Sequence, residues 1–162
     1  MNARTVLRRL GTGLCAVAVT VGAGVSLAPA AYASTNVTVT KEGSTMRVRG
    51  TIAGESMDIT GSGNSATIGN AVAGFGCTQL GGVVQCTGIN RIVVTAAGGD
   101  DAVRVSGSIP SSLNGGFGSD RLSGGDGDDN IFGESGIDFA FGGKGIDNCF
   151  SENPSGCETF NP

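Results

Sequence analysis

The chain has 162 residues, with 30 glycines, no histidine, no tryptophan and a formal net charge of −4. Its acidic balance disfavours binding to nucleic acid or to an anionic membrane and favours cations. The lack of histidine argues against catalytic sites that need a histidine base and against histidine-containing zinc sites.

Residues 1–33 have the pattern of a secretory signal peptide. Three arginines precede an uncharged stretch, residues 10–28, and Ala31-Tyr32-Ala33 is a small-x-small cleavage site. An uncleaved membrane anchor is the alternative, because the apolar stretch is nearly long enough to span a bilayer. We prefer cleavage after Ala33, which predicts a secreted protein and, with the three arginines removed, changes the net charge from −4 to −7.

Residues 34–95 predict short β-strands separated by glycines. β-Branched residues fill 37–40 and 92–94, and no window shows a sustained helical period. The Gly- and Ser-rich stretch 61–70 is typical of turns. We therefore expect a β-rich, strand-and-turn segment that packs on, or continues, the structure after it.

Four cysteines follow the signal peptide, and an even number in an exported chain predicts disulfides. Of the three possible pairings we prefer the local one, Cys77–Cys86 and Cys149–Cys157. Gly81-Gly82 lies midway between the first two cysteines, as a hairpin turn would. A zinc site is the alternative, but C-x8-C and C-x7-C are poor zinc spacings. The second disulfide would close a C-terminal cap, residues 151–162, with a turn at 154–156.

Residues 115–150 consist of four consecutive nonapeptides, GGFGSDRLS, GGDGDDNIF, GESGIDFAF and GGKGIDNCF. Glycine occupies positions 1 and 4, and aspartate position 6, in all four. Position 8 is occupied in turn by Leu122, Ile131, Ala140 and Cys149. Residues 96–114 hold two degenerate copies, so the predicted repeat domain spans 96–150. Such a period predicts stacked coils in which six residues form a turn and three form a short strand.

The position-6 aspartates are candidate calcium ligands, because Ca²⁺ takes 6–8 oxygen ligands from carboxylates and carbonyls. The set comprises Asp120, Asp129, Asp138 and Asp147 in the full repeats and, more weakly, Asp101 upstream. Two nonapeptides make one coil, so we expect Asp120 to share an ion with Asp138, and Asp129 with Asp147. A third, weaker site would pair the turn of Asp101 with that of Asp120. Aspartates stacked without a cation would repel each other, and calcium should therefore drive the folding of this half.

These nonapeptides resemble the hemolysin-type (RTX) calcium-binding repeats, and the chain is similar to the small secreted bacterial calcium-binding proteins of that family. The resemblance covers 115–150 only. It implies an all-β fold with a right-handed parallel β-roll (a β-solenoid) in the C-terminal half, and Ca²⁺ as the cofactor. It also implies ligands from the backbone carbonyls of Gly116, Gly118, Gly127, Gly136 and Gly145. Glu134 departs from the pattern, because it replaces the second glycine of the third repeat.

The predicted function is therefore a non-catalytic, extracellular calcium-binding protein. The alternative is a surface or matrix interaction protein, in which calcium rigidifies an aromatic face; its protein or polysaccharide partner is unknown. That face would pair Phe132 with Phe150 on one sheet and place Phe139 and Phe141 on the other.

Two other functions fit the sequence poorly. An EF-hand at 126–137 fails because Ile131 stands where that loop needs glycine. Glu42, Glu55 and Asp58 offer carboxylates for glycoside hydrolysis, but nothing in their spacing favours it, and they are typical of solvated strand edges. We therefore expect no enzymatic activity.

Overall fold

The computed structural model describes residues 37–160, in which every regular element is a β-strand. The predicted all-β class is confirmed for this part of the chain. The predicted signal peptide lies outside the described residues. Within the described part, no helix is long and apolar enough to cross a membrane.

The strands are short, and most are separated by tight turns. In chain order they are β1 Thr38–Glu42, β2 Thr45–Arg49, β3 Ser56–Ser62, β4 Ser65–Gly69, β5 Val72–Ala73, β6 Thr78–Leu80, β7 Val83–Thr87, β8 Arg91–Gly98, β9 Ala102–Ser106, β10 Ser111–Phe117, β11 Arg121–Gly125, β12 Asn130–Ser135, β13 Phe139–Gly143, β14 Asn148–Phe150, β15 Asn153–Ser155 and β16 Thr159–Phe160.

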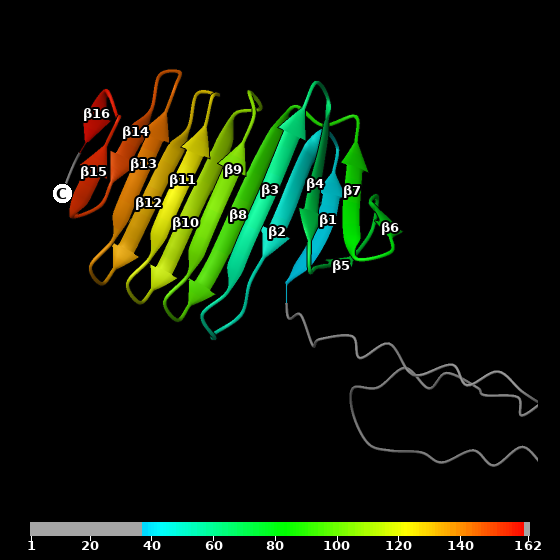
Figure 1. Cartoon of the computed structure of the whole chain (residues 1–162), viewed down its shortest axis with the longest axis horizontal. Helices are drawn as coiled ribbons and strands as arrows, with labels where there is room; N and C mark the ends of the chain where they lie inside the picture. Colours follow the sequence, from blue (N-terminus) through cyan, green and yellow to red (C-terminus); the bar gives the residue numbers. More distant parts are fainter. Residues whose placement is uncertain (1–36, 161–162) are drawn as a thin grey trace, which may run out of the picture. The chain divides into compact units, whose positions relative to one another are not determined.

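The strands form two eight-stranded sheets (Figure 1). Sheet A has the order β16-β14-β12-β10-β8-β2-β1-β5, and sheet B has the order β15-β13-β11-β9-β3-β4-β7-β6. From β8 onward, successive strands alternate between the two sheets, and from β10 onward each pairs in parallel with the strand two places earlier. The chain thus passes back and forth between the sheets through turns at two edges.

The register of these parallel pairs follows the nonapeptides. Leu122 pairs with Ala140, and Ile131 pairs with Cys149, each 18 residues further along the chain. All four side chains are fully buried. The predicted stacking of position 8, with two repeats for each step along a sheet, is confirmed.

The N-terminal strands continue both sheets rather than covering a face of them. β2 pairs in parallel with β8, and β3 with β9, so this pairing begins at Thr45, well upstream of the first recognisable repeat. β1, β4, β6 and β7 then add antiparallel strands. The stretch 61–70, predicted as turns, lies mostly in strands: β3 and β4 form a hairpin with its turn at Gly63 and Asn64. Alternation of small and apolar residues outweighs the glycine and serine content there.

Inward-facing side chains of both sheets form one hydrophobic core. Nineteen of the twenty-three buried apolar residues of the described chain lie in 37–113, including Met46, Met57 and Ile59. The four nonapeptides contribute only their position-8 residues, two of which are the small Ala140 and Cys149. The apolar core is therefore thick at the N-terminal end and thin along the repeats.

Both predicted disulfides are present. Cys77 is bonded to Cys86 across the β6–β7 hairpin, whose turn is Gly81-Gly82. Cys149 of β14 is bonded to Cys157. The predicted turn at 154–156 is wrong in part: Asn153–Ser155 is the strand β15, which pairs with β13, and the chain turns from Gly156 onward. Pro154 is tolerated because β15 is the last strand of sheet B, where one side needs no partner.

Candidate metal centre

The candidate aspartates lie in two rows of turns, one at each edge of the sheets (Figure 1). The first turn row, which leads from sheet A to sheet B, carries Asp101, Asp120 and Asp138. The second turn row, which leads back from sheet B to sheet A, carries Asp129 and Asp147. Each aspartate is the residue directly before the strand that leaves its turn.

Within each row the aspartates are linked by hydrogen bonds from backbone to side chain. The Asp120 amide donates to Oδ1 of Asp138 at 2.8 Å, and the Asp129 amide donates to Oδ1 of Asp147 at 2.9 Å. The Asp101 amide donates to Oδ1 of Asp120 at 2.8 Å. The structure thus brings together the pairs expected from the sequence, Asp101 with Asp120 included.

Each row extends upstream beyond the aspartates that the repeats predict. Asp101 Oδ1 accepts a 2.6 Å bond from the amide of Glu55. Asp129 Oδ1 accepts a 2.6 Å bond from the amide of Ser111, the residue that replaces aspartate in a degenerate repeat.

Each row also ends downstream in a glutamate. Glu152 Oε2 accepts from the Asp138 amide at 3.1 Å, and Glu158 Oε2 accepts from the Asp147 amide at 2.5 Å. Sequence reasoning missed both of these residues and also Glu55, which it assigned to a solvated strand edge. None of the three falls on the nine-residue period, so the repeat carries no signal for them.

The second oxygen of each aspartate has a different environment. The five side chains are at most 2% exposed, and their Oδ2 atoms are buried without any hydrogen-bond partner: these atoms belong to Asp101, Asp120, Asp129, Asp138 and Asp147. A buried carboxylate oxygen without a partner is costly. The arrangement therefore calls for a cation or a proton at each of these oxygens.

The first glycine of every nonapeptide makes room for this oxygen. A Cβ atom placed on any of these glycines would collide with Oδ2 of the aspartate five residues later; the glycines are Gly115, Gly124, Gly133 and Gly142. Any larger residue at position 1 would thus displace the carboxylate. Glycine at position 1 and aspartate at position 6 are therefore one structural unit.

The glycines with candidate carbonyl ligands line the same turns. Gly116, Gly118, Gly136 and Gly145 have positive φ angles, from 105° to 142°, whereas Gly127 does not. The Gly118 carbonyl oxygen lies against Gly136, and the Gly127 carbonyl oxygen lies against Gly145, so tightly that neither neighbour could carry a Cβ. These two carbonyls therefore point along the stack, from one turn toward the next.

Burial changes the acidity of all five aspartates. It raises the pKa of Asp101 and of Asp129 from 3.8 to about 6, against the opposing effect of the hydrogen bonds that each accepts. Burial also raises the pKa of the other three, Asp120, Asp138 and Asp147, and a neighbouring carboxylate in the same row adds to the rise. Without a cation, the folded state thus disfavours the charged form of every one of them.

The donors available for a metal are all oxygens. Within 37–160, no group of three or more His, Cys, Asp or Glu side chains could hold an ion by itself. Carboxylate and carbonyl oxygens do converge, however: Asp120 Oδ2 and the Gly133 carbonyl oxygen both lie against Gly115. A donor set of buried carboxylate oxygens and backbone carbonyls fits a hard cation such as Ca²⁺.

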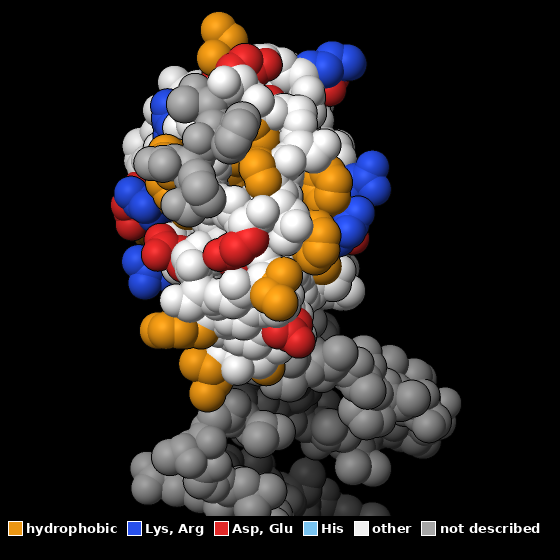
Figure 2. Space-filling model, turned by 90° about the vertical axis from the view of Figure 1, so that its left-hand side faces the viewer, with side chains coloured by type: hydrophobic (Ala, Val, Ile, Leu, Met, Phe, Trp, Pro, Cys, Tyr) orange, Lys and Arg blue, Asp and Glu red, His pale blue; other side chains and the backbone are white. Residues whose placement is uncertain are grey.

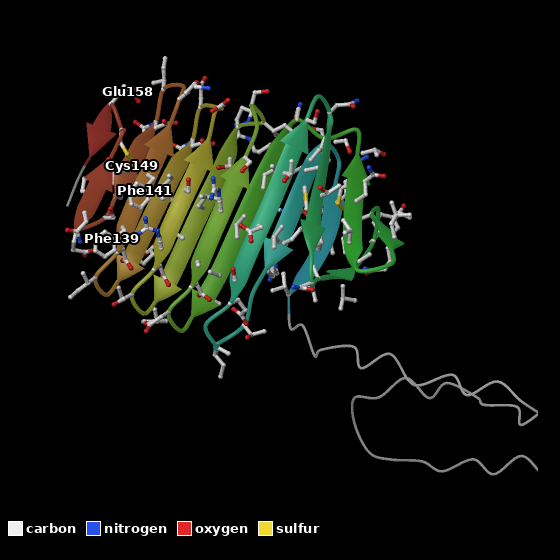
Figure 3. The ribbon with its side chains drawn as sticks, viewed as in Figure 1. Phe139, Phe141, Cys149 and Glu158 are labelled. Atoms are coloured by element: carbon white, nitrogen blue, oxygen red, sulfur yellow. A yellow bond between two sulfur atoms is a disulfide. The ribbon has the colours of Figure 1, made fainter. Side chains whose placement is uncertain are left out.

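The phenylalanines lie on the outer faces of the sheets. Phe132 stacks on Phe150 with ring centroids 4.9 Å apart, as the ladder prediction requires. The guanidinium of Arg121 lies 4.6 Å from the ring centre of Phe141. Phe139, on the same strand β13 (Figure 3), is 42% exposed. The aromatic face is thus split between two sheets and is partly covered by its own neighbours.

Comparison with known proteins finds no counterpart: no protein-family model, no curated protein and no solved structure matches the chain. The resemblance to hemolysin-type repeats therefore rests on the nonapeptides themselves.

Proposed function

We propose that the chain is a secreted, non-catalytic calcium-binding protein of the hemolysin-type repeat kind, with a parallel β-roll in its C-terminal half. Calcium ions would be held between successive turns by the position-6 aspartates and by turn carbonyls such as those of Gly118 and Gly127. The bound ion would supply the positive charge that allows the carboxylates to stack.

One observation carries the proposal: five buried aspartate oxygens have no hydrogen-bond partner. Protein cations do not neutralise them. The ion pairs among the described residues are Arg47–Glu42 and Lys144–Asp126, both exposed and both apart from the five aspartates. At Asp101 and Asp129 protonation does not suffice either, because a carboxyl group with a pKa of about 6 is largely ionised at pH 7.5. A cation from solution is the remaining source of positive charge.

Two further features support calcium and secretion. Calcium-binding modules of extracellular proteins have Kd values of roughly 10⁻⁴ to 10⁻³ M, a range that suits a protein which meets calcium after export. The two disulfides are typical of proteins that fold in an oxidising compartment. A chain with so thin a core along its repeats would gain most of its order from the ions.

Calcium titration followed by circular dichroism tests the proposal. We expect the strand signal of the purified protein to rise between excess chelator and about 10 mM Ca²⁺, a range that brackets extracellular affinities. Magnesium at the same concentration should be much less effective, since it demands octahedral coordination and dehydrates reluctantly. A strand signal that stays flat throughout the calcium titration would refute the proposal.

A pair of variants localises the effect. Asp129→Ala should weaken calcium binding with loss of one site, because it removes a buried carboxylate from the second turn row. Asp58→Ala removes an exposed carboxylate from β3 and is the matched control. Equal calcium stoichiometry in the two variants would contradict the assignment of Asp129.

The alternative function, a calcium-rigidified interaction protein, has one observation in its favour. The Phe132–Phe150 stack orders side chains on the outer face of sheet A, and the Arg121–Phe141 contact does so on the outer face of sheet B. A pull-down with and without chelator separates the two functions. Recovery of a specific partner only in calcium would favour the alternative, and Phe139→Ser should then weaken the capture.

A further inference from the structure

The C-terminal end of the second turn row gathers oxygen atoms that lie outside the nonapeptides. Asp147, the last aspartate of the row, is fully buried, and its Oδ2 has no hydrogen-bond partner. This oxygen lies against Gly142, and the carbonyl oxygen of Gly156 lies against the same glycine. A buried carboxylate oxygen and a carbonyl from the cap therefore converge on one point.

Glu158 stands beside this point and is linked to Asp147 in both directions. The Asp147 amide donates to Glu158 Oε2 at 2.5 Å, and the Glu158 amide donates to the Asp147 carbonyl at 3.0 Å. The Glu158 carboxylate thus takes the role that the carboxylate of the next aspartate would take if the repeats continued. The second carboxylate oxygen of Glu158 is available to a ligand, and Glu158 is exposed to solvent.

The disulfide fixes both cap donors. Cys157, which is bonded to Cys149 in β14, lies between Gly156 and Glu158 in the chain. Figure 3 shows Cys149 and Glu158 at the same end of the molecule, next to β14 and β16. Figure 2 looks onto that end, where several acidic side chains lie on the face and lysine and arginine side chains lie along its margins. The charges here favour a cation.

We propose that Asp147, Glu158 and the Gly156 carbonyl form a terminal calcium site, which the Cys149–Cys157 disulfide holds in place. This inference rests on the proposed function and adds one ion to those bound between the nonapeptides. Water would complete the coordination of the ion, because Glu158 and Gly156 are open to solvent. In this site the cap supplies the donors that a further nonapeptide would otherwise provide.

The test is the number of Ca²⁺ ions bound per chain, measured by equilibrium dialysis and calorimetry on the disulfide-bonded protein. Glu158→Gln keeps an oxygen that can accept from the Asp147 amide but removes the charge. We expect one site to weaken by about 10- to 100-fold, on the scale seen for altered metal-site partners, with the other sites unchanged. Glu42→Gln, at the opposite end of sheet A, is the matched control.

A Glu158→Gln chain that binds as many ions as the wild type, with the same affinities, overturns the terminal site but leaves the proposed function standing. A wild-type chain that binds no calcium overturns both. Cys157→Ser tests the role of the disulfide without altering a fully buried side chain, and it should weaken the same single site. Unchanged binding in Cys157→Ser would refute the positioning role of the disulfide.

Discussion

Replacing Asp129 by asparagine should stabilise the calcium-free protein at neutral pH. The amide oxygen of asparagine can still accept the 2.6 Å hydrogen bond from the Ser111 amide. The buried oxygen that has no partner becomes an uncharged amide nitrogen next to Gly124. The substitution to asparagine therefore removes a buried charge and keeps the hydrogen bond between coils. Asp129→Ala would also remove the charge, but it would lose this hydrogen bond.

The size and sign of the effect follow from the pKa of Asp129. Burial raises it from 3.8 to about 6, so the folded state binds the proton more tightly than the unfolded state does. The contribution of Asp129 to stability is then greatest below pH 4 and is lost as the pH rises through 6. A shift of about two pKa units corresponds to about 3 kcal/mol, which is an upper limit. The advantage of Asp129→Asn should grow from nearly zero at pH 4 to at most this value above pH 7.

Circular dichroism and urea unfolding of both proteins in excess chelator, between pH 4 and pH 8, measure this difference. Repeats that calcium must order are only partly folded in chelator, so the variant should also show the stronger strand signal there. In saturating calcium the order should reverse, because the wild type gains the free energy of an ion that the variant binds poorly. If Asp129→Asn in chelator is less stable than the wild type at pH 7.5, or if the difference does not change with pH, the carboxylate is not the charged, unpaired group described above.

Three further substitutions test other parts of the structure. Glu134 has a positive φ of 76°, so Glu134→Gly should stabilise the protein by about 1 kcal/mol in thermal unfolding; a loss of stability would contradict the strain. Gly136→Ala should cost about 3 kcal/mol or more, because its φ is 142° and its Cβ would collide with the Gly118 carbonyl oxygen. Gly63→Ala is the control, because Gly63 has a φ of 59° and a Cβ there would meet nothing within 4 Å; it should cost about 1 kcal/mol. Urea unfolding measures both variants, and similar losses of stability at the two glycines would refute the collision. Replacing Cys77 by serine together with Cys86 by alanine should cost about 3 kcal/mol in chemical unfolding and leave the calcium stoichiometry unchanged, since this disulfide lies far from the repeats; a change in the number of bound ions would show coupling between the two ends.

The sequence predicts the repeat region well because one physical constraint acts on every coil. Glycine at position 1 and aspartate at position 6 are recognisable in the sequence alone. In the structure the two residues are in direct contact, as Gly124 and Asp129 show. The same period fixes the register, so the pairing of Leu122 with Ala140 could be predicted without coordinates. The disulfides could be predicted too, because each pair is local and the first encloses a glycine turn.

The ends of the turn rows could not be predicted, because there the period is broken. Glu55 lies 46 residues before Asp101 in the sequence, and the strands β4 to β7 lie between them along the chain. Only the pairing of β3 with β9 brings the two residues together. Glu158 lies 11 residues after Asp147, because the cap is shorter than a full coil. At the downstream ends, Glu152 and Glu158 have the longer side chain needed to reach an amide from a backbone that departs from the repeat.

The uneven core gives residues 37–113 a physical role in the folding of the repeats. A parallel strand gains stability only when a partner strand is already in place, and closing such non-local pairs costs entropy before any contact forms. β8 and β9 belong to the part with the thick apolar core, and they present their free edges to β10 and β11. Asp101, which stands in the turn between β8 and β9, also offers its amide to Asp120, the first aspartate of the full repeats. The N-terminal strands would therefore act as a template that fixes register and strand direction. Under the proposed function, each later coil would need only its own aspartate, its glycines and an ion to be added.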